Sequence, residues 1–347
     1  MEADRYRNGA RLLADIGGTN ARFAIERAAG SIEAIATLPC SGHASLADAA
    51  RAYLSRHPGL DVRHAAIAIA NPVEGDFVKM TNHDWQFSIA ETRDALGLDT
   101  LLVVNDFAAL AAAVPGLGAA DVMAVGPGQV RGDGVIGLLG AGTGLGMAGL
   151  IPSNDGWTVL QSEGGHVAFS PSDEREQAIL DFCWTRFSHV SAERLMSGPG
   201  LSLILEALAA WRGLPVPAPL APADIVERGL TGTDPLCTEV LECFCGMLGT
   251  AAANLAVTLC ARGGIYIGGG IVPRLGDWFA RSPFRQRFEA KGRFSTFTSR
   301  IPTLVITAPY PALAGAATML DRHLASSHAP ARLHYAQPNT EPRHAAI

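Results

Sequence analysis

The chain has 347 residues, which is long for a single hydrophobic core and suits two lobes. Apolar residues make up 48% and charged residues 17% of the chain, as in a globular protein. The net charge is −6 and no basic run stands out, which argues against a nucleic-acid-binding surface. Residues 135–151 are the best candidate for a membrane span, but six glycines interrupt them. Because the first residues also lack an apolar signal region, we expect a cytoplasmic protein with no membrane segment.

The first pattern along the chain is a strand, a turn and a second strand. Leu12–Ile16 is a short apolar run of the kind that forms a buried strand. We expect a tight reversal at Gly17 and Gly18, because glycine accepts positive φ angles. Residues 22–25 resume an extended pattern, so the stretch predicts a β-hairpin.

The tip of this hairpin carries the short polar side chains of Thr19 and Asn20. Together with the exposed N–H groups of Gly17 and Gly18, they suit a phosphate group. Asp15 is tolerable beside a phosphate only if a cation lies between the two negative charges, which suggests magnesium. An ordinary tight hairpin explains this stretch, taken alone, equally well.

Strand-like and helix-like patterns then alternate up to residue 114. The expected strands cover residues 31–38, 65–70, 77–80 and 101–104, and the expected helices cover residues 46–56, 89–96 and 107–114. Asn105 and Asp106 therefore lie where a strand ends and a helix begins, which is where α/β folds bind ligands. A simple N-cap role explains Asp106 by itself, because Asp is common at that position.

Residues 135–151 repeat the pattern of the first hairpin. An apolar strand over 135–139 leads into a glycine-rich turn, and residues 147–151 are apolar again. The turn contains Gly142, Thr143 and Gly144. A dinucleotide-binding fingerprint would lead into a helix, and because 147–151 do not look helical we reject it. The two hairpins form a weak internal repeat of a phosphate-binding type.

Residues 162–169 form a polar loop with two glycines. Glu163 supplies an acceptor and His166 a switchable donor, so the loop suits a polar ligand. A histidine satisfied by backbone groups is the alternative for His166. Glu193 can serve simply as an acid in the first turn of a short helix that Ser191 caps.

The remainder of the chain is mostly helical. The expected helices cover residues 173–187, 201–211, 224–229, 235–260, 284–290 and 312–324, and the expected strands cover 157–160, 265–267 and 303–307. The helix over 235–260 is apolar on more than one face, so we expect it to be central and buried. Residues 291–294 are expected to begin an extended segment, and 326–347 to form a disordered tail.

One glycine pattern and one cysteine pattern remain to be interpreted. Gly268, Gly269 and Gly270 follow a strand and leave room for a flat group such as adenine, with tight backbone packing as the alternative. Of the six cysteines, only Cys243 and Cys245 are close in sequence. No second pair or neighbouring histidine completes a zinc site, so we expect buried free thiols.

Six segments, taken in order, resemble the bacterial ATP-dependent glucokinase family, within the actin and hexokinase superfamily of split ATPases. The segments cover residues 15–22, 80–85, 104–107, 162–166, 192–201 and 268–274, and the resemblance runs from residue 12 to 324. Phosphate-binding loops, a metal-binding acid and a base that orients the nucleophile are the parts that phosphoryl transfer needs.

The resemblance implies a role for individual residues. The hydroxyls of glucose would be held by Asn105, Asp106, Glu163, His166 and Glu193, with Asn82 of the 80–85 segment beside them. Asp106 would be the general base that takes the proton of the 6-hydroxyl. The phosphates of ATP would lie against Gly17, Gly18, Thr19, Asn20, Gly142, Thr143 and Gly144, and the nucleoside against Gly268, Gly269 and Gly270. Asp15 would bind Mg²⁺ through water.

The same resemblance implies a two-lobed α/β architecture: an actin-like (ribonuclease H-like) ATPase fold with a duplicated β-sheet core and a cleft between the lobes. The small lobe would contain residues 1–113 and 308–325, and the large lobe residues 114–307. A homodimer is implied. No zinc is expected, because Phe169–Pro171 stand where a related family carries a cysteine-rich loop.

Three rival functions remain open. A kinase of the same fold could act on mannose, fructose or an amino sugar. A non-catalytic sugar sensor would lack the base or carry an added DNA-binding module, whereas Asp106 is present and no basic helix-turn-helix segment precedes Leu12. A chaperone-like or actin-like ATPase would leave Glu163 and His166 without a sugar to bind.

Overall fold

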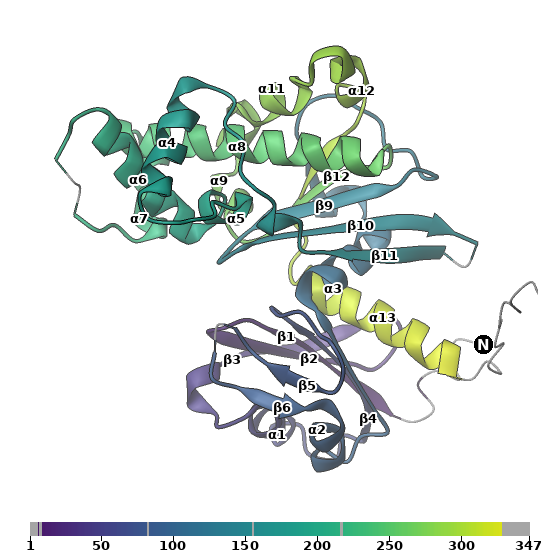
Figure 1. The fold of residues 1–347 in the computed structure, drawn as a ribbon. Coiled ribbons are helices and arrows are strands. Elements are labelled where there is room, and N and C mark those ends of the chain that lie inside the picture. The colour runs from purple at the N-terminus through teal and green to yellow at the C-terminus, as the bar shows by residue number, and fades with distance from the viewer. Residues whose placement is uncertain (1–5, 7–8, 82, 155, 216–217, 328–347) are drawn as a thin grey trace, which may run out of the picture.

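Two β-sheets with matching strand order form the two halves of the molecule (Figure 1). This computed structural model describes residue 6 and residues 9–81, 83–154, 156–215 and 218–327. The first sheet contains, in spatial order, β3 (Ile32–Pro39), β2 (Asn20–Glu26), β1 (Ala10–Ile16), β4 (Val62–Ile69) and β7 (Thr100–Asn105). The second contains β11 (Gly156–Ser162), β10 (Leu145–Ser153), β9 (Ile136–Ala141), β12 (Gly264–Gly268), β13 (Thr303–Ile306) and β8 (Val122–Ala124).

The pairing directions repeat along with the order. β1 pairs antiparallel with β2 and parallel with β4, and β9 pairs antiparallel with β10 and parallel with β12. The expected internal repeat and duplicated β-sheet core are therefore confirmed. The return strand β10 also confirms that the second glycine-rich turn does not lead into a helix.

The first sheet is accompanied by α1 (Leu46–Leu54), α2 (Ile89–Ala95) and a small pair of strands, β5 (Phe77–Lys79) and β6 (Gln86–Ser88). Both helices begin where a serine accepts a backbone N–H: Ser45 from Asp48 and Ser88 from Glu91. The N-terminal hairpin reverses through a hydrogen bond from the Gly17 N–H to the Asn20 carbonyl. Gly17 does so without a positive φ angle, so our reason for that glycine was wrong.

In the described part of the chain, nine helices accompany the second sheet, and α8 and α9 contact its strands. They are α4 (Glu174–Trp184), α5 (Ala192–Leu195), α6 (Gly198–Trp211), α7 (Pro222–Thr231), α8 (Pro235–Leu259), α9 (Val272–Leu275), α10 (Asp277–Arg281), α11 (Phe284–Glu289) and α12 (Ser295–Thr298). Single 3₁₀ turns cover η2 (Cys40–Gly42), η3 (Val114–Gly116), η4 (Ala119–Asp121), η5 (Gly164–His166) and η6 (Gly292–Phe294).

Among the described helices, α8 alone is long and apolar enough to cross a membrane by length and composition. However, 72% of its most apolar window is buried inside the protein, which is typical of a core helix. The expectation of a buried central helix is confirmed. Residues 135–151, the candidate chosen from the sequence, instead form most of β9 and β10.

Three expectations are corrected by the structure. Residues 292–294 form the turn η6 rather than an extended segment, because the Lys291 N–H donates to the Ser295 hydroxyl at 3.1 Å and starts a helical run. Cys260 is exposed, whereas the other five cysteines are buried free thiols. The last helix, α13 (Pro311–Ser327), runs two residues into the expected tail, whose residues 328–347 lie outside the described part of the chain.

The two halves meet where α13 crosses α3 (Asp106–Ala113), at the centre of Figure 1. Apolar residues of α13 such as Leu313 and Leu320 pack on Leu13 and Ala66 of the first sheet. A Cβ atom at Gly315 would lie 1.6 Å from the Ala109 carbonyl oxygen, so only glycine fits this crossing. The lobe boundaries at residues 113 and 308 stay a prediction.

We expect Gly315→Ala to lower the free energy of unfolding by about 2 kcal/mol or more, because the added methyl meets backbone that cannot move aside. The matched control is Gly116→Ala, where a methyl meets nothing within 4 Å and the expected change is about 0.5 kcal/mol or less. Urea unfolding at equilibrium measures both variants. Equal stability of the two variants would contradict the close crossing.

Candidate active site

Asn105 and Asp106 lie at the junction of β7 and α3. The N-cap is Asn105, whose Oδ1 accepts the Ala108 N–H at 3.0 Å, so the interpretation of Asp106 as a simple N-cap is wrong. Asp106 is the first helical residue, and its Oδ1 accepts the Phe107 N–H at 2.8 Å and the Asn105 side-chain amide at 3.2 Å. Two donors at the start of α3 therefore hold one oxygen of the Asp106 carboxylate.

Burial raises the pKa of the Asp106 carboxyl to about 6. The Phe107 N–H opposes this shift, while the negative charges of Asp15 and Glu163 add to it. Asp106 is therefore a carboxylate at neutral pH that binds a proton more readily than an ordinary aspartate. A group with these properties suits general base chemistry.

Asp15 of β1 forms an ion pair with Arg22 of β2, at 2.7 Å between Oδ2 and a guanidinium nitrogen. Burial raises the pKa of the Asp15 carboxyl, and Arg22 counteracts that shift. The Arg22 guanidinium also lies 5.0 Å from the centre of the Tyr310 ring. The sequence alone suggested no role for Arg22 or Tyr310. The hairpin register pairs Asp15 directly with Arg22, so counting outward from the turn could have found this ion pair.

A second polar cluster contains Glu163, His166 and Glu193. The Nε2 atom of His166 lies 3.9 Å from a carboxylate oxygen of each glutamate. Glu193 follows Ser191, which caps α5 as expected, and its Oε2 accepts the Leu145 N–H at 2.9 Å. A Cβ atom at Gly144 would lie 2.3 Å from that same oxygen. The glycine of the second hairpin therefore leaves the space that Glu193 occupies.

Some of the predicted residues line two cavities. A cavity of about 370 Å³ is lined by Asp15, Asp106, Gly268, Gly269 and Gly270, together with Arg22, Thr307 and Tyr310. A cavity of about 510 Å³ is lined by Thr143, His166 and Glu193. Asn105 and Glu163 line neither cavity, but the negative charge of Glu163 contributes to the raised pKa of Asp106.

Other predicted residues lie outside these two cavities. Gly17, Gly18, Thr19 and Asn20 form the tip of the first hairpin, with Thr19 and Asn20 exposed, and Gly142 and Gly144 belong to the turn of the second. Asn82 lies outside the described residues.

The glycine triplet Gly268–Gly270 combines tight backbone packing with open space for a ligand. A Cβ at Gly269, whose φ is +80°, would lie 2.3 Å from the Ala141 carbonyl oxygen, which is tight backbone packing. A Cβ at Gly270 would meet nothing within 4 Å. The triplet thus packs against the end of β9 and still lines the first cavity.

Known proteins resemble this chain over most of its length. The family model for glucokinase matches residues 12–323. A "Bifunctional protein glk" from Burkholderia thailandensis is 56% identical over 94% of this chain and 50% of its own length. A glucokinase from Chromobacterium violaceum is 54% identical over 92% of each chain. The chain spans about half the length of the bifunctional Burkholderia relatives that it matches.

Solved structures give the same result for the fold. The crystal structure of a glucokinase from an Antarctic psychrotroph has a TM-score of 0.81 at 36% identity, covering 90% of this chain and 99% of that one. A ROK family glucokinase from Streptomyces griseus, solved with glucose and AMPPNP, has a TM-score of 0.64 at 21% identity, covering 90% of this chain and 100% of that one. The latter likeness shows the fold alone.

The duplicated sheets and these neighbours define a two-lobed protein of the actin-like ATPase fold that sugar kinases share. The chain belongs to the glucokinase family.

We expect Asp106→Asn to raise the stability of the free protein at pH 8. The pKa of Asp106 is about 6 in the folded chain, against 3.8 for the ordinary group. Ionisation of Asp106 therefore lowers the free energy of unfolding as the pH rises from about 4 to about 6. Removing the charge should therefore add on the order of 2 kcal/mol to the unfolding free energy at pH 8. The gain should shrink as the pH falls toward 4.

Urea unfolding at both pH values measures this effect, with Asp84→Asn as the control because that carboxylate is exposed. A destabilised Asp106→Asn protein at pH 8 would show that the charged carboxylate is better solvated than its burial implies.

Proposed function

We propose that this chain transfers the γ-phosphoryl group of ATP to the 6-hydroxyl of D-glucose, giving glucose 6-phosphate and ADP. The observation that carries this proposal is the position of Asp106. Its carboxylate lies in one cavity with the glycine triplet and within electrostatic reach of Glu163, which belongs to the polar cluster. A nucleotide on one side and a sugar on the other would meet at this carboxylate.

Asp106 acts as the general base in this proposal. The sugar 6-oxygen attacks the γ-phosphorus, the bond from that phosphorus to the bridging oxygen of ADP breaks, and the hydroxyl proton moves to the Asp106 carboxylate. With a pKa of about 6 in the free protein, the carboxylate is ionised at neutral pH and able to accept that proton.

Glucose is the proposed acceptor because of the chemistry of the polar cluster. Asn105, Asp106, Glu163, His166 and Glu193 offer carboxylate, amide and imidazole groups to hydroxyls, and Asn82 is proposed to join them. An epimer would leave one of these groups unpaired, at a cost of about 1–3 kcal/mol each. Glucose is therefore preferred here over mannose, fructose and amino sugars.

The proposed cofactors are ATP and Mg²⁺. Gly17, Gly18, Thr19, Asn20, Gly142, Thr143 and Gly144 would contact the phosphates, and Gly268, Gly269 and Gly270 the nucleoside. The Asp15 and Asp106 carboxylates line one cavity, and the charge of Asp15 raises the Asp106 pKa, a repulsion that a hard cation would relieve. Asp15 would hold Mg²⁺ through water, and the ion would neutralise phosphate charge.

Among the described residues, no group of three or more His, Cys, Asp or Glu side chains could hold a metal by itself. This fits an ion that takes most of its ligands from phosphates and water. We also propose a homodimer in the cytoplasm, with lobes of residues 1–113 plus 308–325 and 114–307 that close over the sugar. Sedimentation velocity tests the dimer.

The function is tested by ADP release over a panel of hexoses, with the whole chain and Asp106→Ala. We expect turnover with glucose above that with mannose, fructose and glucosamine. Asp106→Ala should lose at least about 100-fold in kcat, since a positioned base contributes that much or more. Asp181→Ala, at an exposed position of α4, serves as the matched control. No turnover with glucose, or a native rate in Asp106→Ala, would overturn the proposal.

A further inference from the structure

A third cavity, of about 790 Å³, lies away from both parts of the candidate active site. Its lining includes Arg131, Arg262 and Arg300 together with Gln129 and Phe297, and no acidic residue. The chain as a whole carries a net charge of −6, so three guanidinium groups around one hollow are not explained by overall composition.

Two of the three cations of this cavity have no acidic partner among the described residues, and the third has a distant one. Within the described part of the chain, neither Arg262 nor Arg300 has a hydrogen bond or ion pair at its guanidinium. The Arg262 guanidinium lies 5.9 Å from the centre of the Phe297 ring, which leaves its N–H groups unoccupied. Arg131 has one distant partner, Asp133, at 3.7 Å, and both side chains are more than half exposed.

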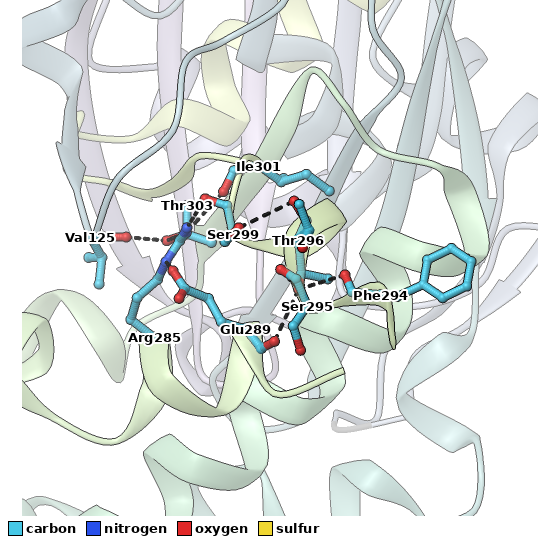
Figure 2. Close-up of polar contacts among 10 residues, drawn as sticks. Val125, Arg285, Glu289, Phe294, Ser295, Thr296, Ser299, Ile301 and Thr303 are labelled. Atoms are coloured by element: carbon cyan, nitrogen blue, oxygen red, sulfur yellow. Dashed lines mark hydrogen bonds and ion pairs between the residues drawn. The ribbon is translucent and has the colours of Figure 1, made fainter. Parts of the chain in front are cut away.

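The residues on either side of Arg300, Ser299 and Ile301, are held by the buried Arg285 (Figure 2). Arg285 donates to the carbonyl oxygens of Ser299 and Ile301, each at 2.9 Å, and to the Thr303 hydroxyl at 3.1 Å. Its charge is balanced by Glu289 at 2.7 Å. The two carbonyls on either side of Arg300 are thus fixed, so this residue is preorganised rather than part of a loose loop.

The opposite wall of the cavity is held by close backbone contacts. A Cβ at Gly128, whose φ is +132°, would lie 2.6 Å from the Pro302 nitrogen. A Cβ at Gly134 would lie 2.4 Å from the Gly263 nitrogen. These two contacts fix both ends of the loop that carries Arg131, one against the segment after Arg300 and the other against the segment after Arg262.

We propose that this cavity is a second ligand site, which binds a small phosphorylated molecule. Guanidinium groups pair with phosphate oxygens through parallel N–H donors, and three of them suit a ligand with more than one negative charge. The volume fits a small molecule, and a nucleic-acid surface would need a wider basic area than three arginines.

The site lies at the far end of strands that also reach the candidate active site. β12 begins two residues after Arg262 and ends at Gly268, and β13 begins two residues after Ile301 and ends beside Thr307. Gly268 and Thr307 line the cavity of Asp106. A ligand bound to the arginines would therefore lie against the segments that lead into the two strands whose ends line the proposed nucleotide site.

The test uses radiolabelled pyrophosphate and equilibrium dialysis of the full chain. No nucleotide is added, because a nucleotide would compete for the arginine cavity. Pyrophosphate bound at the proposed nucleotide site is common to all variants, so the difference between variants reports on the arginine cavity. We expect the double variant Arg262→Gln plus Arg300→Gln to lose one site per chain, with at least a tenfold rise in Kd at that site. Arg293→Gln is the matched control, because Arg293 is exposed on a neighbouring turn and does not line the cavity.

Retained binding in the control and lost binding in the double variant would support the site. No binding to the native chain at millimolar pyrophosphate, or equal binding by the double variant and the control, would overturn it. Circular dichroism establishes that the double variant is folded. Hexose phosphorylation without pyrophosphate should be unchanged in that variant, so failure of this proposal is distinguishable from failure of the proposed function.

Discussion

The whole structure depends on the close packing of α3 between the two sheets. Three glycines leave room for this helix, and they come from three separate elements. A Cβ at Gly146 of β10 would lie 2.1 Å from the Phe107 ring, one at Gly268 of β12 would lie 2.6 Å from Leu110, and one at Gly315 of α13 would lie 1.6 Å from the Ala109 carbonyl oxygen. Interiors this dense do not allow a helix to shift to relieve a misfit. The position of α3 is therefore set on three sides.

This packing determines what the helix presents at its N-terminus. Asn105 caps the helix and Asp106 begins it, so fixing α3 also fixes the carboxylate that we propose as the base. The same burial that holds Asp106 raises its pKa to about 6. The ionised Asp106 carboxylate lowers the free energy of unfolding at neutral pH, because its surroundings disfavour the charge. Such a loss of stability is common at functional sites. Close packing also positions a residue at the second hairpin. Gly144 has no side chain, and this leaves the space in which the Glu193 carboxylate accepts the Leu145 N–H.

Local sequence patterns predicted most elements and the family, because apolar periodicity, caps and glycine-rich turns act over a few residues. Ser88, Ser191 and the repeat of the two hairpins are examples that the structure confirms. The failures come from backbone conformation and capping that residue type alone does not specify. Phe294 looked extended but lies in a helical run, and Cys260 looked buried but ends a helix at the surface with a φ of +52°. The assignment of site residues stays a prediction, carried by the family resemblance and by the cavities in which some of them meet.

The most direct test of this account is the kinetics of Gly146→Ala. The added methyl forces the Phe107 ring to move, and Phe107 donates the backbone N–H that holds Asp106, so the base should be displaced without loss of the fold. We predict a fall in kcat for glucose phosphorylation of about 100-fold, with the KM for ATP unchanged. Gly116→Ala is the control, because a methyl there meets nothing within 4 Å and Gly116 is not among the proposed binding residues. A native kcat in a folded Gly146→Ala protein would contradict the claim that the packing of α3 positions the base.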